Sequence, residues 1–263
     1  MSSLNGRVAI VTGSAMNIGR ATALMLAREG ASVMVHAKSN GEGVEETRKL
    51  VAAAGGKAGG TLADLSTEAG AKSLIDATMA QFGRIDILVN NAVSSTQGHF
   101  DALSDEEWQH HIDVKLLGYV RCAREALPWL KKSGRGRVIN IAGMTARIVS
   151  EFRMTNGVVN AGVTNFTKHL AEQVGRDGVT VNAIHPGYTE TPRLDGILKR
   201  WAELEGTSLE ESARRRLKEI PIGRFIKAED LANLVVFLCS DAASAITGQA
   251  IAVDGGSGRA ISY

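Results

Sequence analysis

Cysteine and aromatic residues are scarce in this sequence. The two cysteines, Cys122 and Cys239, lie far apart inside apolar, helix-like segments, so we expect buried reduced thiols rather than a disulfide or a nucleophile. Aromatic residues make up 5% of the 263 residues, whereas hydrophobic residues make up 44%. The core must therefore consist mainly of Val, Ile, Leu and Ala, as buried parallel strands and their covering helices require.

Long apolar runs and an excess of one charge are also absent. The formal net charge is +2, without a basic or acidic block, which argues against nucleic acid or an anionic membrane as a partner. No apolar run could span a bilayer, and residues 1–6 do not resemble a secretory leader. We therefore expect a cytoplasmic protein. The histidines show no metal-ligand spacing with Cys, Asp or Glu, so no metal site is expected.

Short β-branched runs alternate along the chain with longer helical patterns. Strands are expected at 7–12, 31–37, 57–63, 85–90, 137–142, 179–184 and 250–253, and helices at 18–29, 42–54, 68–82, 105–131, 158–176 and 229–241. This alternation predicts an α/β fold with a doubly wound, Rossmann-like parallel sheet of seven strands in a single domain, 1–263. Residues 188–220 break the rhythm. They are predicted to form either a helical lid on the substrate side or a solvated, charged surface helix.

A glycine-rich turn joins the first expected strand to the first helix. It runs from Thr12 to Gly19, and its candidate cofactor-binding residues are Gly13, Ser14, Asn17, Ile18 and Gly19. Such a turn lets the backbone approach a pyrophosphate, and the helix N-terminus offers free N–H groups. Asn17 replaces the middle glycine of the usual spacing, and asparagine tolerates positive φ. We predict dinucleotide binding; the alternative is a tight turn without a ligand.

The second strand ends in Lys38, Ser39 and Asn40. An acidic residue here would accept hydrogen bonds from the adenosine ribose and favour NAD. Lys38 instead offers a positive charge where a 2′-phosphate would sit. This favours NADP, with NAD possible if Lys38 is an ordinary exposed lysine.

These motifs resemble the short-chain dehydrogenase/reductase family over almost the whole chain. Further segments that resemble its markers are Asp64-Leu65, Asn90-Asn91-Ala92, Pro186-Gly187 with Thr191, 220–224, 247–249 and 254–256. The resemblance implies that Asp64, Leu65, Asn91, Ala92, Pro186, Gly187 and Thr191 contact the cofactor. It also implies a small-molecule substrate and a homo-oligomer, either a tetramer or a dimer.

The resemblance fails at the family's catalytic group. Aligned on the flanking helices, Gly143 stands for its serine, Asn156 for its tyrosine, Asn160 for its lysine and Lys115 for its asparagine. No tyrosine here (Tyr119, Tyr188 or Tyr263) has a lysine four residues later. Because the family's tyrosine is a general acid–base, a role worth about 10²–10⁴ in rate, we expect retained cofactor binding and lost standard chemistry.

Lys115, Asn156 and Asn160 are the candidate catalytic residues. A partly desolvated Lys115 could act as acid–base, electrostatic stabiliser or amine nucleophile; alternatively it extends to solvent. The two asparagines lie one turn apart and could recognise substrate or ribose, or could be structural amides. Nearby, the segment 143–155 carries Arg147, Glu151 and Arg153. We expect these to face water, with an arginine clamp on an acidic substrate as the alternative.

Three functions stay open. The first is an NADP(H)-binding oxidoreductase with an unconventional active site, in which Lys115, a water or the substrate supplies the proton. The second is a catalytically silent nucleotide-binding homologue, or the non-catalytic subunit of a mixed oligomer. The third is a non-redox lyase or hydrolase that uses Lys115.

Overall fold

A computed structural model describes residues 4–259; residues 1–3 and 260–263, Tyr263 among them, lie outside the described part. Within it, seven parallel strands form one sheet in the order β3-β2-β1-β4-β5-β6-β7. The strands are β1 (Val8–Val11), β2 (Ser32–Ala37), β3 (Lys57–Leu62), β4 (Ile87–Asn90), β5 (Arg137–Ile141), β6 (Thr180–Pro186) and β7 (Ala250–Val253). This confirms the predicted doubly wound parallel sheet. The strand order reverses between β1 and β4, where ligands bind in such sheets.

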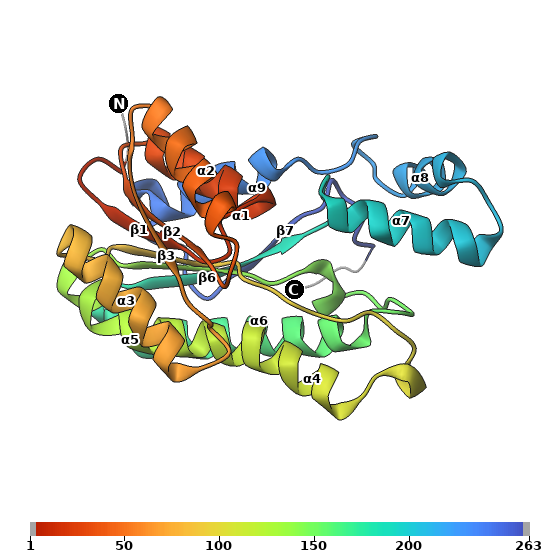
Figure 1. Cartoon of the computed structure of the whole chain (residues 1–263), viewed down its shortest axis with the longest axis horizontal. Helices are drawn as coiled ribbons and strands as arrows, with labels where there is room; N and C mark the ends of the chain where they lie inside the picture. Colours follow the sequence, from red (N-terminus) through yellow and green to blue (C-terminus); the bar gives the residue numbers. More distant parts are fainter. Residues whose placement is uncertain (1–3, 260–263) are drawn as a thin grey trace.

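Helices cover both faces of the sheet (Figure 1). One layer contains α1 (Asn17–Arg28), α2 (Gly41–Ala53) and α9 (Ala228–Cys239); the other contains α3 (Glu68–Phe82), α4 (Asp105–His111), α5 (Gly118–Ser133) and α6 (Met154–Val174). Alternate residues of a strand supply the two apolar cores: Val11 of β1 belongs to one and Ile10 to the other. Both faces of β1 are therefore buried, as its uninterrupted apolar sequence requires.

The helix expected at 105–131 is not one regular helix. A π-helical segment, η2 (Ile112–Leu117), separates α4 from α5 and buries Val114 and Lys115. Such segments are frequent at functional sites, and this one carries a candidate catalytic residue. α6 begins at Met154 rather than near 158, so Asn156 lies inside the helix.

The segment 188–220 forms two helices beyond the carboxyl ends of the strands (Figure 1). α7 (Pro192–Glu205) buries Leu194, Ile197 and Leu198, whereas α8 (Leu209–Lys218) carries exposed ion pairs such as Arg214–Glu211. An apolar covering helix and a solvated charged helix therefore stand side by side. Whether they move as a lid stays a prediction.

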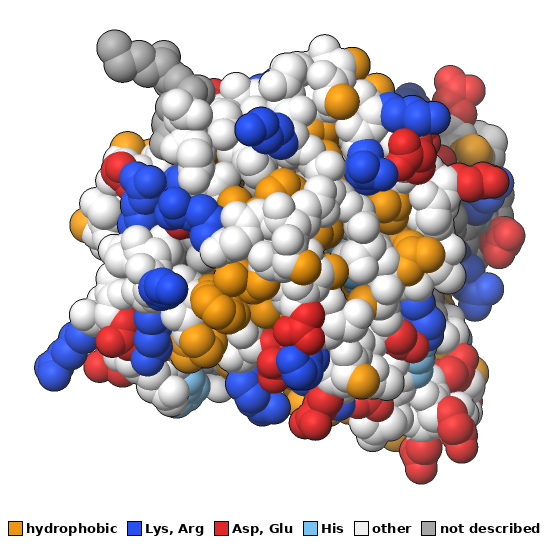
Figure 2. Space-filling model, turned by 60° about the vertical axis from the view of Figure 1, so that its left-hand side comes forward, with side chains coloured by type: hydrophobic (Ala, Val, Ile, Leu, Met, Phe, Trp, Pro, Cys, Tyr) orange, Lys and Arg blue, Asp and Glu red, His pale blue; other side chains and the backbone are white. Residues whose placement is uncertain are grey.

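The remaining sequence expectations concern thiols, membranes and surface charge. Cys122 and Cys239 are free and buried, which confirms the prediction. No helix within residues 4–259 combines the length and apolar character that crossing a membrane requires. Figure 2 shows basic and acidic side chains scattered over one face, where neither sign forms a continuous zone.

Candidate cofactor cleft and active site

The turn between β1 and α1 is tightly packed, and its glycines leave no room for a side chain. A Cβ on Gly13 would lie 2.9 Å from the Ala92 Cα, and one on Gly19 would lie 2.2 Å from the Gly13 carbonyl oxygen. Asn17 has a φ of 50° and is the only non-glycine residue within 4–259 with positive φ. The turn therefore requires glycine at 13 and 19, and it accepts asparagine at 17.

Side chains behind the turn hold it in place. Thr12 Oγ1 accepts hydrogen bonds from the backbone N–H groups of Asn91 (2.8 Å) and Ala92 (3.0 Å), and Asn91 Nδ2 donates to the Thr12 and Gly13 carbonyls. Ser14 is fully buried; its hydroxyl donates to the Val11 carbonyl at 2.6 Å and accepts from the His36 N–H. Ser14 thus shapes the turn and does not line the cleft beside it.

The N-terminus of α1 opens into a cleft of about 440 Å³. The residue before the helix, Met16, makes no side-chain cap, and the first turn carries no acidic residue, so N–H groups and the positive end of the helix dipole face the cleft. Predicted cofactor residues that line it are Gly13, Asn17, Ile18, Gly19, Lys38, Asp64, Leu65, Asn91, Ala92 and Thr191. These groups fit the pyrophosphate and adenosine of a dinucleotide.

Lys38 lies at the adenosine end of this cleft and is already paired. Its Nζ is 2.7 Å from Asp64 Oδ2, and the Lys38 side chain is 59% exposed. The hydrogen bond from Lys38 is the main cause that lowers the pKa of Asp64 to about 2. Asn40 caps α2 by accepting from the Gly43 N–H. At this position Lys38 can approach a 2′-phosphate, but it shares its charge with Asp64.

A second cavity, of about 400 Å³, brings the three candidate catalytic residues together. It is lined by Lys115, Asn156 and Asn160, by Pro186 and Gly187, and by much of α7. Ile18, Asn91 and Thr191 border both this cavity and the cofactor cleft. A ligand in the second cavity therefore lies next to the nicotinamide end predicted for a dinucleotide.

Lys115 is almost fully buried, with 5% of its surface exposed. Its Nζ donates to the Ala142 carbonyl at 2.9 Å. Burial is the main cause that lowers the pKa of Lys115 well below its usual value, and the charges of Arg193 and Arg153 lower it further. The side chain does not extend to solvent, and its burial favours the neutral amine over the ammonium.

The two asparagines are buried as well, each 2% exposed. Asn156 Nδ2 donates to Ser95 Oγ at 3.2 Å and Asn160 Nδ2 to Thr145 Oγ1 at 2.8 Å. Neither Oδ1 atom has a hydrogen-bond partner within residues 4–259. A buried acceptor without a partner is costly, so both oxygens are suited to a ligand donor.

Comparisons with known proteins identify the family. A family model described as enoyl-(acyl carrier protein) reductase matches residues 13–258. The 3-oxoacyl-[acyl-carrier-protein] reductase FabG of Thermotoga maritima is 32% identical, over 96% of this chain and 98% of that protein. The chain belongs to the short-chain dehydrogenase/reductase family.

Solved structures of short-chain dehydrogenase/reductases share this fold closely. A variant of actinorhodin polyketide ketoreductase with NADPH has a TM-score of 0.92 and 33% identity, covering 97% of this chain and 98% of that chain. The L-sorbose reductase of Gluconobacter frateurii, complexed with NADPH and L-sorbose, has a TM-score of 0.92 and 31% identity, covering 99% and 100%. The Rossmann-like architecture inferred above is thus the one this oxidoreductase family uses.

One expectation about charged residues in this short-chain dehydrogenase/reductase was wrong. Arg153 does not face water: it lines the second cavity, and burial is the main cause that lowers its pKa to about 10, with the Arg193 charge adding to the shift. The reason is that Arg153 is the residue preceding α6, which places its side chain under α7 rather than on the loop surface. Arg147 points elsewhere and donates to the Ala250 carbonyl.

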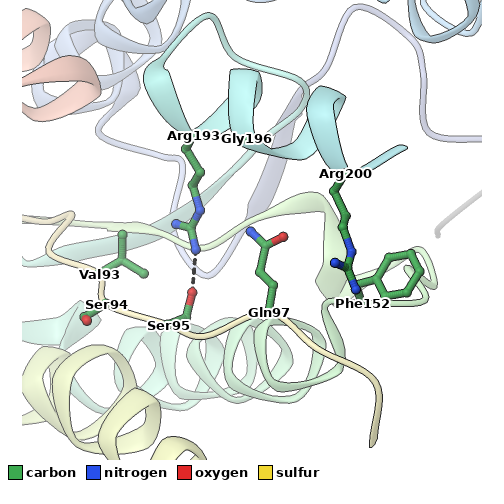
Figure 3. Close-up of a pocket in the computed structure, with 8 residues that line it drawn as sticks. All are labelled: Val93, Ser94, Ser95, Gln97, Phe152, Arg193, Gly196 and Arg200. Carbon is green, nitrogen blue, oxygen red and sulfur yellow. Dashed lines mark hydrogen bonds between the residues drawn. The ribbon is translucent and has the colours of Figure 1, made fainter. Parts of the chain in front are cut away.

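Sequence reasoning missed one lining residue of the site and one buried neighbour of Lys115. Arg193, in the first turn of α7, lines the second cavity and donates to the hydroxyl of Ser95 in the adjoining recess (Figure 3); its position just after Thr191 was the available signal. His111 lies four residues before Lys115 and is fully buried, and neither ring nitrogen has a partner within the described residues. No spacing in the sequence distinguished His111 from its exposed neighbour His110.

Proposed function

We propose that this chain is an NADP(H)-dependent oxidoreductase in which Lys115 handles the proton that a tyrosine handles elsewhere in the family. The observation that carries the proposal is the buried Lys115 amine in the cavity that adjoins the cofactor cleft. In the alignment described above, Gly143, Asn156 and Asn160 stand at the positions of the family's serine, tyrosine and lysine. Two solved relatives were captured with NADPH, which supports this cofactor.

The cofactor would be held by groups along both cavities. The α1 N-terminus would bind the pyrophosphate and Lys38 the 2′-phosphate, and Pro186, Gly187 and Thr191 would border the nicotinamide. Asn160 Oδ1, which has no partner among residues 4–259, would accept a hydrogen bond from a ribose hydroxyl. When bound, the dinucleotide supplies or receives the hydride; the remaining steps belong to the protein's own side chains.

Lys115 can serve either direction of the reaction. As a neutral amine, its Nζ accepts the proton of a substrate hydroxyl during oxidation; as an ammonium, it donates a proton to the substrate during reduction. General acid–base catalysis is most effective when the pKa of the group lies near the working pH, and burial moves Lys115 in that direction. Asn156, with its unpaired Oδ1, orients the substrate.

Replacing Lys115 by methionine tests the proposal. We expect turnover of NADPH with ketones, activated alkenes or iminium compounds to fall by about 10²–10⁴, because the proton donor is lost. The affinity for NADPH should stay nearly the same, since Lys115 does not line the cofactor cleft. The pH profile of turnover should also lose the limb that reports Lys115. Steady-state kinetics measures the turnover and its pH profile, and calorimetry measures the affinity for NADPH.

The matched control is Lys132→Met, on the exposed end of α5. Equal turnover in the two variants would remove Lys115 from the mechanism. NADPH binding without turnover on any substrate would favour the catalytically silent homologue, and a borohydride-trapped adduct at Lys115 would favour the non-redox function.

By family analogy we also propose a homotetramer or dimer with α5 and α6 at one interface. Val158 of α6 is 55% exposed, which leaves apolar surface on that helix. Light scattering on the purified chain measures the state directly, and a monomer at micromolar concentration would contradict this part of the proposal.

A further inference from the structure

We propose that the second cavity binds the carboxylate of a small organic acid with an apolar body, through Arg153 and Arg193. The inference rests on the proposed function, because this acid would be the substrate or product of the same site. It specifies the substrate class of that oxidoreductase as compounds that carry a carboxylate.

Both arginines reach the same cavity from different elements. Arg153 is the residue preceding α6, and Arg193 lies in the first turn of α7, two residues after Thr191. Arg193 points from α7 toward the segment 93–97, where its hydrogen bond to Ser95 holds it (Figure 3). Both guanidinium groups line this cavity, and Arg193 lies close enough for its charge to act on Arg153. Each guanidinium presents a planar set of donors that matches a carboxylate.

Neither arginine is neutralised by the protein. Within residues 4–259, no carboxylate lies within 4.0 Å of Arg153 or Arg193, and Arg153 Nε is buried without a partner. Arg216, which lines the same cavity, is paired with both Glu205 and Glu219. Both side chains are half-buried, and cations removed from water without a partner are costly. The contrast within one cavity therefore supports Arg153 and Arg193 as ligands of an external anion.

The other residues that line the cavity indicate which shape of anion would fit. Leu194, Ile197 and Trp201 of α7 form an apolar wall, and the Trp201 ring packs edge-on against Phe152 at 5.8 Å. The cavity volume of about 400 Å³ lies in the range for small-molecule sites. A charged head at the arginines and an apolar body along α7 would fill it.

The positive charge is a property of the cavity and not of the whole surface. The net charge is only +2, and both signs are mixed on the face drawn in Figure 2. Glu151 and Glu219 also line the cavity, but Glu219 is engaged by Arg216. The proposed binding of a carboxylate therefore depends on the residues that line the cavity and not on the charge of the whole surface.

A bound carboxylate would also act on Lys115. Arg193 and Arg153 are the charges that lower the pKa of Lys115 after burial itself. An anion that neutralises them would raise the pKa of Lys115 and shift the amine toward its protonated form. Binding of the substrate would thus prepare the proton donor beside it.

Calorimetry on the NADPH-loaded protein tests the inference with three probes of equal chain length: hexanoate, hexanamide and hexyl phosphate. We expect hexanoate to bind at least about tenfold more tightly than hexanamide. Arg153→Gln and Arg193→Gln should each weaken hexanoate by about 10–100-fold, the range for a lost hydrogen bond to a charged group. Arg153→Lys should keep part of the affinity, and the control Arg214→Gln, on the exposed side of α8, should keep all of it.

Equal binding of hexanoate and hexanamide, or hexanoate affinity that neither glutamine variant changes, would overturn the inference. Tighter binding of hexyl phosphate than of hexanoate would overturn the carboxylate assignment. The affinity for NADPH and the turnover of neutral substrates, measured on the parent protein, report the proposed function separately. If both persist while hexanoate fails to bind, only the inference is lost. Because the glutamine variants remove unpaired buried charges, their thermal midpoints should equal or exceed that of the parent.

Discussion

Lys115 and Asn160 contact consecutive residues at the end of β5. Lys115 Nζ donates to the Ala142 carbonyl, and a Cβ on Gly143 would lie 2.6 Å from Asn160 Nδ2. The Lys115 amine and the Asn160 amide therefore border the same buried segment that follows β5. The glycine at 143 is what makes room for the Asn160 side chain.

This arrangement predicts a charge-exchange effect on stability. Asn160→Lys should lower the free energy of unfolding by about 3 kcal/mol, because it adds a second buried cation without a partner. Adding Lys115→Asn should recover most of the loss, since one ammonium then remains. Urea unfolding of the two single variants and the double variant measures the coupling. Strictly additive effects would show that the two positions do not share a space.

At the scale of elements, the proposed preference for NADPH depends on Lys38, the residue that follows β2. Lys38→Ala should weaken NADPH binding by about tenfold, less than a buried charged contact would give because the side chain is exposed, and should leave NADH unchanged. Calorimetry with both nucleotides measures the ratio. Lys49→Ala on α2 is the matched exposed control. Equal losses for NADPH and NADH would mean that Lys38 does not contact the 2′-phosphate.

Most elements could be predicted from the sequence because their apolar periodicity is local. The helix 68–82 was predicted at its observed bounds, and the strands to within about two residues. The π-helical segment could not be, since one altered turn leaves the apolar spacing around Lys115 almost unchanged. The cofactor turn could be predicted because positive φ and close backbone contact restrict which residues occupy it.

The cavity was less predictable because it depends on contacts between distant segments. Arg153 belongs to a charged stretch that resembles a surface loop, and α7, about 40 residues further along, is what covers it. Arg193 meets Ser95 across almost a hundred residues of sequence. Burial that arises from such long-range packing leaves no periodic pattern to detect.

For the whole molecule, buried histidines predict loss of stability in acid. Burial is the main cause that lowers the pKa of His111 to about 3 and that of His185 to about 4. Between pH 6.5 and these values the unfolded chain binds protons that the folded chain does not. The free energy of unfolding should therefore fall with decreasing pH by up to about 1.4 kcal/mol per pH unit for each histidine.

Urea unfolding at pH 7, 6 and 5 measures this slope. His111→Gln should reduce it by the contribution of one proton, whereas His169→Gln, on the exposed side of α6, should leave it unchanged. An identical slope in all three proteins would show that folding does not lower the pKa of His111.

Arg193 borders three neighbouring spaces: the cofactor cleft, the second cavity, and a solvent-facing recess of about 590 Å³ beneath α7. The Arg193 side chain thus lies where these three spaces adjoin. A change in the rotamer of Arg193 would therefore alter the boundary of all three spaces at once. Binding of the nucleotide and binding of the acid would then be coupled through a single guanidinium.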